Sequence, residues 1–354
     1  MNTRFTPYGS PALERHFADV CDRVREGISE IIPPDRLEGI ALAGGYGRGE
    51  GGVLRTDEGD QPYNDLEFFV FVQGNTKLND RRYKASLHDL GGRLTPVAGI
   101  DVEFKIISSA ALRRSKSSMF YYDLVMGHRW LIGDDSLLDE TEHHRDAALI
   151  PLHEVTRLLF NRCSGLLFFF FFLQQSNFNA DDADFVARNI AKAQLALGDA
   201  VLATEGRYHW SCVERHRRLV VDEEVRLHHA KGVAFKLYPQ RSVMSRDALT
   251  EIHAEVSLLA KDLFLRIESQ RLAHHFPSAV AYASSKINKC PEQPALKNIL
   301  QRMRTPRVEL GIHQRIERHP RESLLHALAV MLWTDSSVKH EHMHAYETLW
   351  HRFN

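Results

Sequence analysis

Cysteine is scarce in this chain of 354 residues, which contains four: Cys21, Cys163, Cys212 and Cys290. They lie far apart and form no C-x-x-C pair, so the sequence has neither a disulfide framework nor a zinc-knuckle pattern. The first 17 residues also lack the apolar core of a signal peptide. We therefore expect a cytoplasmic protein with free thiols.

An excess of charge of either sign is also missing, because 45 Lys and Arg stand against 46 Asp and Glu, a formal net charge of −1. Neutralising many phosphates requires many Lys and Arg side chains, so a long nucleic acid is not an expected partner. No P-loop, Gly-x-Ser-x-Gly or His-Glu-x-x-His motif occurs. These absences exclude the familiar P-loop ATPases, serine hydrolases and zinc proteases.

Long apolar runs are absent except for residues 166–173, LLFFFFFL, which are eight apolar residues in a row. A membrane-spanning helix needs about 20 apolar residues, and this run is bounded by Arg162 and Gln174. The run therefore predicts a buried helix segment and no membrane span. It could equally serve a helix–helix interface between copies, so the oligomeric state stays open.

The order of hydrophobic patterns predicts an α+β protein of two domains. Up to residue 148, a helix over 12–32 and further helical segments over 77–94 and 109–126 alternate with short strands. The expected strands cover 40–43, 64–72, 100–106 and 130–132. This domain is expected to be a mixed β-sheet flanked by helices. Residues 149–354 are expected to form an all-helical domain, with helices at 152–175, 181–205, 213–230, 246–273, 294–304 and 321–333.

A glycine-rich turn, residues 44–52, directly follows the first expected strand. Glycines let the backbone approach a ligand closely and adopt positive φ, so that successive N–H groups can bind an anion. Within the turn, Arg48 has the planar guanidinium suited to phosphate oxygens, although a salt bridge with Glu50 is the alternative. The turn is thus a candidate phosphate site.

Acidic residues mark two of the expected strands. Asp65 and Glu67 are two residues apart, as are Asp101 and Glu103, so each pair projects from one face of its strand. If the strands are neighbours, these carboxylates converge. Two like charges 4 Å apart repel by about 4 kcal/mol at an effective dielectric constant of 20. Such a cluster needs divalent cations, shared protons or Arg and Lys partners to persist. Its oxygen ligands suit Mg²⁺, a hard divalent cation.

Three motifs in this order resemble the nucleotidyltransferase superfamily that includes DNA polymerase beta. They are GGYGRGE at 44–50, NDLEF at 64–68 and IDV at 100–102. The Arg-Gly-Glu form of the turn is similar to small bacterial nucleotidyltransferases and aminoglycoside adenylyltransferases. The resemblance covers roughly residues 38–135, under a third of the chain.

The resemblance implies a role for each matching residue. Gly44 and Gly45 would cradle the phosphates of ATP or another nucleoside triphosphate, and Asp65 and Glu67 would hold two Mg²⁺ ions. Asp101 would complete the second metal site and help to deprotonate an acceptor hydroxyl. The expected reaction transfers a nucleoside monophosphate, AMP, to that hydroxyl and releases pyrophosphate.

Two departures and one ambiguity accompany the resemblance. Gly45 stands where the family often has Ser, and the interval to Asp65 is lengthened by a polar loop over 53–62. Strand parity does not distinguish Asp101 from Glu103, so either can be the third ligand, and we favour Asp101 because it opens its strand. A catalytically weakened nucleotide-binding regulator or toxin–antitoxin module, or a hydrolase using the same acids, are alternatives to the transferase.

The helical domain is expected to close the cleft and to select the acceptor, which can be a small molecule, a protein side chain or an RNA end. Arg188 and Lys192 are four residues apart and share a helix face. They are candidate ligands for the triphosphate, with an ordinary solvated surface as the alternative.

Overall fold

A computed structural model describes residues 4–175, 177–303, 317–334 and 340–353 of the protein. The chain forms two compact units. Unit 1 comprises the described parts of Met1–Pro151 together with Glu205–Leu219 and Val233–Arg241. Unit 2 comprises Leu152–Thr204, Val220–Gly232 and the described parts of Ser242–Asn354. Two segments from beyond the middle of the sequence thus fold with the N-terminal part of the chain.

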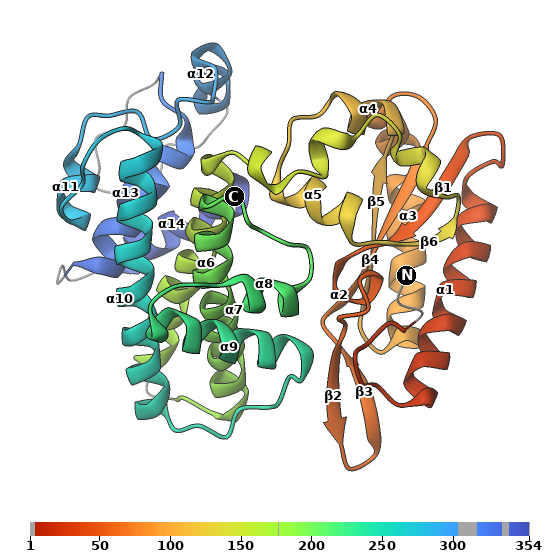
Figure 1. Ribbon diagram of the computed structural model, residues 1–354, viewed down its shortest axis with the longest axis horizontal. Coiled ribbons are helices and arrows are strands. Elements are labelled where there is room, and N and C mark those ends of the chain that lie inside the picture. The colour runs from red at the N-terminus through yellow and green to blue at the C-terminus, as the bar shows by residue number, and fades with distance from the viewer. Residues whose placement is uncertain (1–3, 176, 304–316, 335–339, 354) are drawn as a thin grey trace. The chain divides into compact units, whose positions relative to one another are not determined.

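A four-stranded mixed sheet forms the centre of unit 1 (Figure 1). Its strand order is β5-β4-β1-β6, with β4 parallel to β5 and with β1 antiparallel to both of its neighbours. The strands are β1 (Leu37–Leu42), β4 (Asp65–Val72), β5 (Asp101–Ile107) and β6 (Arg129–Ile132). This sheet, and the all-helical C-terminal region, confirm the predicted α+β class.

Helices cover both faces of the sheet. On one face, α1 (Pro11–Ile31) and α3 (Thr76–Ala98) pack on Phe68 and Val70 of β4. On the other face, α4 (Ser109–Arg114) and α5 (Met119–Met126) pack on Phe69 and Phe71. The middle and end of β4 are therefore apolar on both sides, whereas its first three residues include Asp65 and Glu67.

Local signals explain where the helices of unit 1 begin and end. The Ser10 side chain accepts a hydrogen bond from the Leu13 N–H, and Pro11 occupies the first turn of α1, both of which favour a helix start. Helix α3 ends at Gly99, whose φ of 74° is the left-handed conformation that suits glycine. The predicted helix over 109–126 is two helices, α4 and α5, because Ser115 and Ser118 lie between them in extended conformation.

The polar loop predicted over residues 53–62 is instead a β-hairpin. Strands β2 (Gly52–Thr56) and β3 (Gly59–Tyr63) pair with each other in a separate two-stranded sheet. The prediction was wrong because Pro62 and the charged tip residues hide the alternation of a strand. Pro62 is tolerated in a hairpin because a proline disturbs an outer strand less than a central one.

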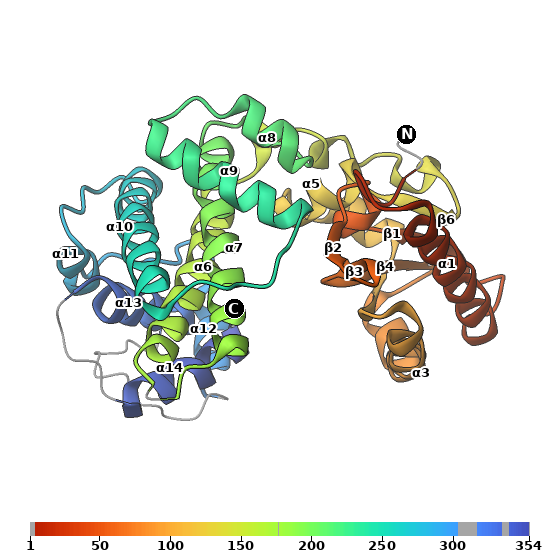
Figure 2. The ribbon, with the colours of Figure 1, turned by 90° about the horizontal axis from the view of Figure 1, so that it is seen from below.

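Unit 2 is built from helices. Its elements are α6 (Leu152–Leu173), α7 (Ala180–Thr204), α10 (Arg246–Arg271), α11 (Ala279–Ser284), α12 (Ala295–Met303), α13 (Pro320–Trp333) and α14 (His340–Phe353). Helices α6, α7 and α10 run side by side (Figures 1 and 2) around Leu166, Val186 and Val256. The predicted helix over 213–230 is divided into α8 (Cys212–Arg218) and α9 (Glu223–Leu237), and α11 and α14 were not predicted.

The apolar run lies in α6, where Leu166 and Leu167 are fully buried and Phe169 packs edge-on against Phe185 of α7 at 4.8 Å. Within the described residues, α6 is the one helix long and apolar enough to cross a membrane by length and composition. Half of its apolar stretch is buried inside the protein. One such helix is weak evidence for a span, since core helices of soluble proteins have the same composition.

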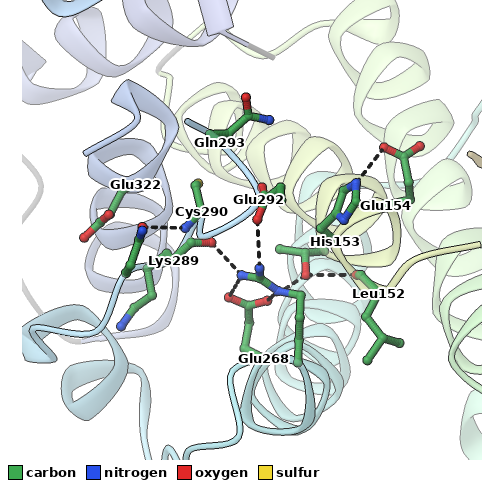
Figure 3. A network of polar contacts seen from close by, with 12 residues as sticks. Leu152, His153, Glu154, Glu268, Lys289, Cys290, Glu292, Gln293 and Glu322 are labelled. Carbon is green, nitrogen blue, oxygen red and sulfur yellow. Dashed lines mark hydrogen bonds and ion pairs between the residues drawn. The ribbon is translucent and has the colours of Figure 1, made fainter. Parts of the chain in front are cut away.

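A buried carboxylate, Glu268 of α10, joins several helices of unit 2 (Figure 3). It accepts hydrogen bonds from the Thr156 hydroxyl at 2.6 Å and the Tyr282 hydroxyl at 2.8 Å. Arg271 donates to both of its oxygens, at 2.7 and 2.8 Å, and also to the Lys289 carbonyl at 2.6 Å. Burial alone would lower the pKa of Arg271, but the hydrogen bonds to Glu268 raise it above its ordinary value.

Candidate active site

Three carboxylates of unit 1 come together at the sheet. Strands β4 and β5 are parallel neighbours with Asp65 opposite Asp101 and Glu67 opposite Glu103. Alternate residues of paired strands share one face, so this register directs the acids to the same side. Oxygen atoms of Asp65, Glu67 and Glu103 all lie within 4.8 Å of one another. We call these three residues the carboxylate cluster.

Asp101 is not a member of the carboxylate cluster, although it shares the register of Asp65. Its side chain is exposed at the first position of β5. The alternation of side chains along β5 leaves Asp101 and Glu103 as alternatives for the third ligand, and the sequence analysis favours Asp101. The geometry instead brings Glu103 to the other two acids.

Lys105 supplies a positive charge to the carboxylate cluster, and the sequence analysis missed it. Its Nζ lies 2.6 Å from Glu67 Oε1 and 3.9 Å from Glu103 Oε2. The alternation of side chains along a strand could have indicated it, because Lys105 follows Glu103 by two residues on β5 and therefore projects from the same face.

The electrostatics of Asp65 report an excess of negative charge in the cluster. Its pKa is raised, first by burial and then by the neighbouring charges of Glu67 and Glu103, while Lys105 opposes the shift. Carboxylates in such a group need protons or cations to compensate them. Their oxygen atoms are the ligands that Mg²⁺ prefers, so the donor set fits a divalent cation.

The glycine turn lies directly against this cluster. Helix α2 (Gly44–Gly47) follows β1, and the Ala43 N–H before it donates to the Glu67 carbonyl at 2.9 Å. Gly44 has a φ of 65°, and a Cβ added there would lie 3.2 Å from Glu67 Oε2. The N–H groups that open a helical turn have no acceptor within the helix. The turn therefore presents backbone donors close to the carboxylates.

The backbone around Gly45 leaves little room for a side chain. A Cβ at this position would lie 3.0 Å from the Glu50 carbonyl oxygen, closer than an ordinary contact. That carbonyl belongs to the same turn, in which the Glu50 N–H donates to the Gly45 carbonyl at 2.8 Å. The tight closure of the turn thus favours glycine at position 45.

Tyr46 connects the glycine turn to the base of the hairpin. Its buried hydroxyl accepts a hydrogen bond from the Tyr63 N–H at 2.8 Å and lies 2.9 Å from the Gly52 carbonyl. Burial raises the pKa of Tyr46, so the hydroxyl stays neutral. Asn64 follows with a φ of 78°, a left-handed conformation that turns the chain from β3 into β4 at Asp65. Tyr46 thereby fixes where β4 starts.

Arg48 has a partner inside the fold. Its side chain is largely buried, with Nη1 3.1 Å from Asp123 Oδ2 of α5. Burial alone would lower the pKa of Arg48, but Asp123 raises it, so the guanidinium remains charged. Arg48 therefore joins the glycine turn to α5, and the phosphate contact expected of it stays a prediction.

Glu50 holds the other end of the turn. Its carboxylate is 7% exposed and accepts hydrogen bonds from the Ser211 hydroxyl at 2.5 Å and the Cys212 N–H at 2.9 Å. Burial alone would raise the pKa of Glu50, but these two hydrogen bonds hold it below its ordinary value. Neither the predicted pair with Arg48 nor any sequence motif indicated this contact, which joins residues 161 positions apart.

Arg188 and Lys192 belong to α7 in unit 2. Arg188 forms an ion pair with Asp184 one helical turn earlier, with Nη2 3.1 Å from Oδ2. The structure thus gives Arg188 a partner on its own helix, and binding of a triphosphate by these two residues stays a prediction.

No family model and no curated protein matches this sequence. One solved structure with some similarity is spectinomycin adenyltransferase from Enterococcus faecialis, with ATP and spectinomycin. The identity is 14% and the TM-score 0.36, and the match covers 70% of this chain and 98% of that one. A similarity this distant carries no argument about the residues or the activity of this protein.

Proposed function

We propose that this protein is a magnesium-dependent nucleotidyltransferase that transfers AMP from ATP to a hydroxyl of a small molecule. One observation carries the proposal: three carboxylates within 4.8 Å of one another lie against a glycine turn with positive φ. A hard-cation site beside backbone phosphate donors is the equipment for transfer of a phosphorus group. The sequence motifs at 44–50, 64–68 and 100–102 agree with this chemistry.

The carboxylate cluster is the proposed metal site, with Asp65, Glu67 and Glu103 as ligands. Glu103 replaces Asp101 in this role because its oxygen atom lies with those of the other two acids. Bound Mg²⁺ would neutralise phosphate charge and lower the pKa of a hydroxyl beside it.

The chain's own groups account for the remaining steps of the proposal. The N–H groups of Gly44 and Gly45 would bind phosphate oxygens. The acceptor oxygen bonds to the α-phosphorus as the bond from that phosphorus to the leaving oxygen breaks, which releases pyrophosphate. The exposed carboxylate of Glu103 is placed to take the proton that the acceptor hydroxyl loses.

Transfer of label tests the proposal directly. The purified protein would be incubated with Mg²⁺, ATP labelled at the α-phosphate, and a panel of aminoglycosides and other polyhydroxylated small molecules. We expect a labelled acceptor and one pyrophosphate per transfer, both lost in Asp65→Asn. Asp57→Asn is the matched control, since Asp57 is an exposed acid at the hairpin tip.

Three results would contradict the proposal. Equal transfer by Asp65→Asn and the wild type would remove the metal assignment. Tight binding of ATP with no product on any acceptor would instead favour a nucleotide-binding regulator, and release of free AMP alone would favour a hydrolase.

A further inference from the structure

Lys105 is a cation already present where the proposed metal site needs positive charge. Its Nζ is 2.6 Å from Glu67 and 3.9 Å from Glu103. The cluster thus brings three carboxylates together with one ammonium group. Among the described residues, Lys105 is the one cationic side chain that forms an ion pair with the cluster.

The stem of Lys105 allows the ammonium to move. The side chain is 41% exposed, and its other contact is with the face of the Phe69 ring, whose centroid lies 5.7 Å from Nζ. A partly exposed ion pair of this kind contributes little to stability. Lys105 can therefore leave Glu67 without loss of the fold, and its removal should leave the protein folded.

The two forms in which a divalent cation can arrive carry opposite charge. A free cation is repelled by the ammonium of Lys105 and must also displace it from Glu67. A cation bound to a nucleoside triphosphate brings excess negative charge, which the displaced ammonium can compensate at short range. The same side chain thus opposes one form and favours the other.

We propose that Lys105 makes the carboxylate cluster select a divalent cation already bound to the triphosphate over the free cation. This inference rests on the proposed function, because it requires the cluster to be a metal site. It adds an order of binding: the ammonium holds the empty cluster, and metal and nucleotide enter together. Lys105 is here a selectivity residue, and the three carboxylates remain the ligands.

Binding measurements with Mn²⁺ test the inference without any need for turnover. Free Mn²⁺ would be titrated against wild type, Lys105→Met and Lys105→Arg by paramagnetic resonance. A preformed one-to-one complex of Mn²⁺ with a non-hydrolysable ATP analogue would then be titrated into the metal-free protein by calorimetry. Lys77→Met is the matched control, since Lys77 is an exposed lysine on α3, whose side chain forms no ion pair in the described structure.

Opposite changes in the two affinities are expected. Lys105→Met should bind free Mn²⁺ about tenfold more tightly, and the analogue with Mn²⁺ about tenfold more weakly. The effect is this small because the Lys105 side chain is 41% exposed and solvent screens its charge. Lys105→Arg should resemble the wild type, and thermal unfolding should be unchanged in all variants. A merely structural role for Lys105 would not move the two affinities in opposite directions.

Two patterns of results would overturn the inference and are distinguishable. If Asp65→Asn abolishes Mn²⁺ binding but Lys105→Met leaves both affinities unchanged, or shifts both in one direction, the metal site stands and the selectivity role fails. If the wild type binds no Mn²⁺ with or without the analogue, the proposed function fails and the inference fails with it.

Discussion

Two groups of carboxylates in this protein differ in how their charge is compensated. In unit 2, Glu268 is fully buried, and it accepts hydrogen bonds from Thr156, from Tyr282 and from Nε and Nη2 of Arg271. In unit 1, the carboxylate cluster brings oxygen atoms of three acids within 4.8 Å of one another, and among the described residues only Lys105 forms ion pairs with it, to Glu67 and Glu103.

The difference separates a structural group from a candidate site. A carboxylate whose lone pairs are all satisfied holds elements in place and has no capacity for a ligand. A cluster with excess charge costs stability and is retained where a cation or substrate compensates it. Burial alone would have selected the wrong group, since Glu268 is the more buried of the two.

The largest expected effect tests the cluster. Asp65→Asn should lower the rate of transfer at least a thousandfold, because the amide keeps the shape of the side chain and loses the charge that holds a cation. Steady-state release of pyrophosphate measures it, with Asp57→Asn as control. A loss of less than tenfold would place the cation elsewhere.

Next in size is the loss of Glu268. Glu268→Ala removes both hydrogen bonds between the buried Arg271 guanidinium and Glu268, and leaves it with Glu292, whose Oε2 lies 3.5 Å from Nη1. The free energy of unfolding should fall by about 3–5 kcal/mol. Urea unfolding followed by circular dichroism measures the change. The double variant Glu268→Ala with Arg271→Met should recover part of the loss, and an absence of recovery would contradict the ion pair as its cause.

Glu50 combines features of both groups, since it lies in the glycine turn beside the site and both of its carboxylate oxygens accept hydrogen bonds. Glu50→Gln should lower the free energy of unfolding by about 1–3 kcal/mol, because Ser211 and Cys212 then donate to a neutral acceptor. The lowered pKa of Glu50 means that its stabilisation is present above the ordinary Glu value and is lost as pH falls through the lower folded value. Unfolding midpoints between pH 6 and pH 3 should therefore converge for wild type and Glu50→Gln.

Lys289 shows the cost of a buried charge that forms no ion pair within the described part of the chain. It is 1% exposed, its Nζ lies 4.7 Å from the centroids of the Phe276 and Tyr282 rings, and burial lowers the pKa of Lys289 to about 8. The unfolded state binds the proton more tightly, so stability should rise with pH between about 8 and 10. Lys289→Met should remove this rise and stabilise the protein at pH 7 by roughly 1–2 kcal/mol, as measured by urea unfolding.

The smallest effect returns to Asp65. Since its pKa is raised in the folded protein, ionised Asp65 destabilises the metal-free fold at neutral pH. Asp65→Asn should therefore raise the free energy of unfolding in the absence of metal, by at most about 1 kcal/mol because the group is partly solvated. A variant that is inactive and less stable would indicate a structural role instead.

Much of unit 1 could be predicted from the sequence because its signals are local. The period-2 alternation of residues 100–106 and the apolar run after Glu67 predicted β5 and β4, and the spacing of the acids placed each pair on one face. The parallel register that brings them together also required α3, which the helical spacing of 77–94 predicted. These features depend on neighbours within a few residues.

The remaining features depend on contacts between distant segments. No local pattern shows that Glu50 binds Ser211, or that residues 205–219 fold with unit 1. The choice between Asp101 and Glu103 also lies beyond parity, because both occupy the same face, Asp101 opposite Asp65 and Glu103 opposite Glu67. The hairpin was not predicted because Pro62 and the charged residues at its tip hide the alternation of a strand.

The hydrogen bonds of Tyr46 have a consequence for how this chain can vary during evolution. They fix Gly52 and Tyr63, where the hairpin begins and ends, so the spacing between the glycine turn and Asp65 no longer depends on what lies between them. Homologues should accept insertions or deletions at residues 57–58 without moving Asp65, whereas a change of length next to Tyr63 should be eliminated by selection.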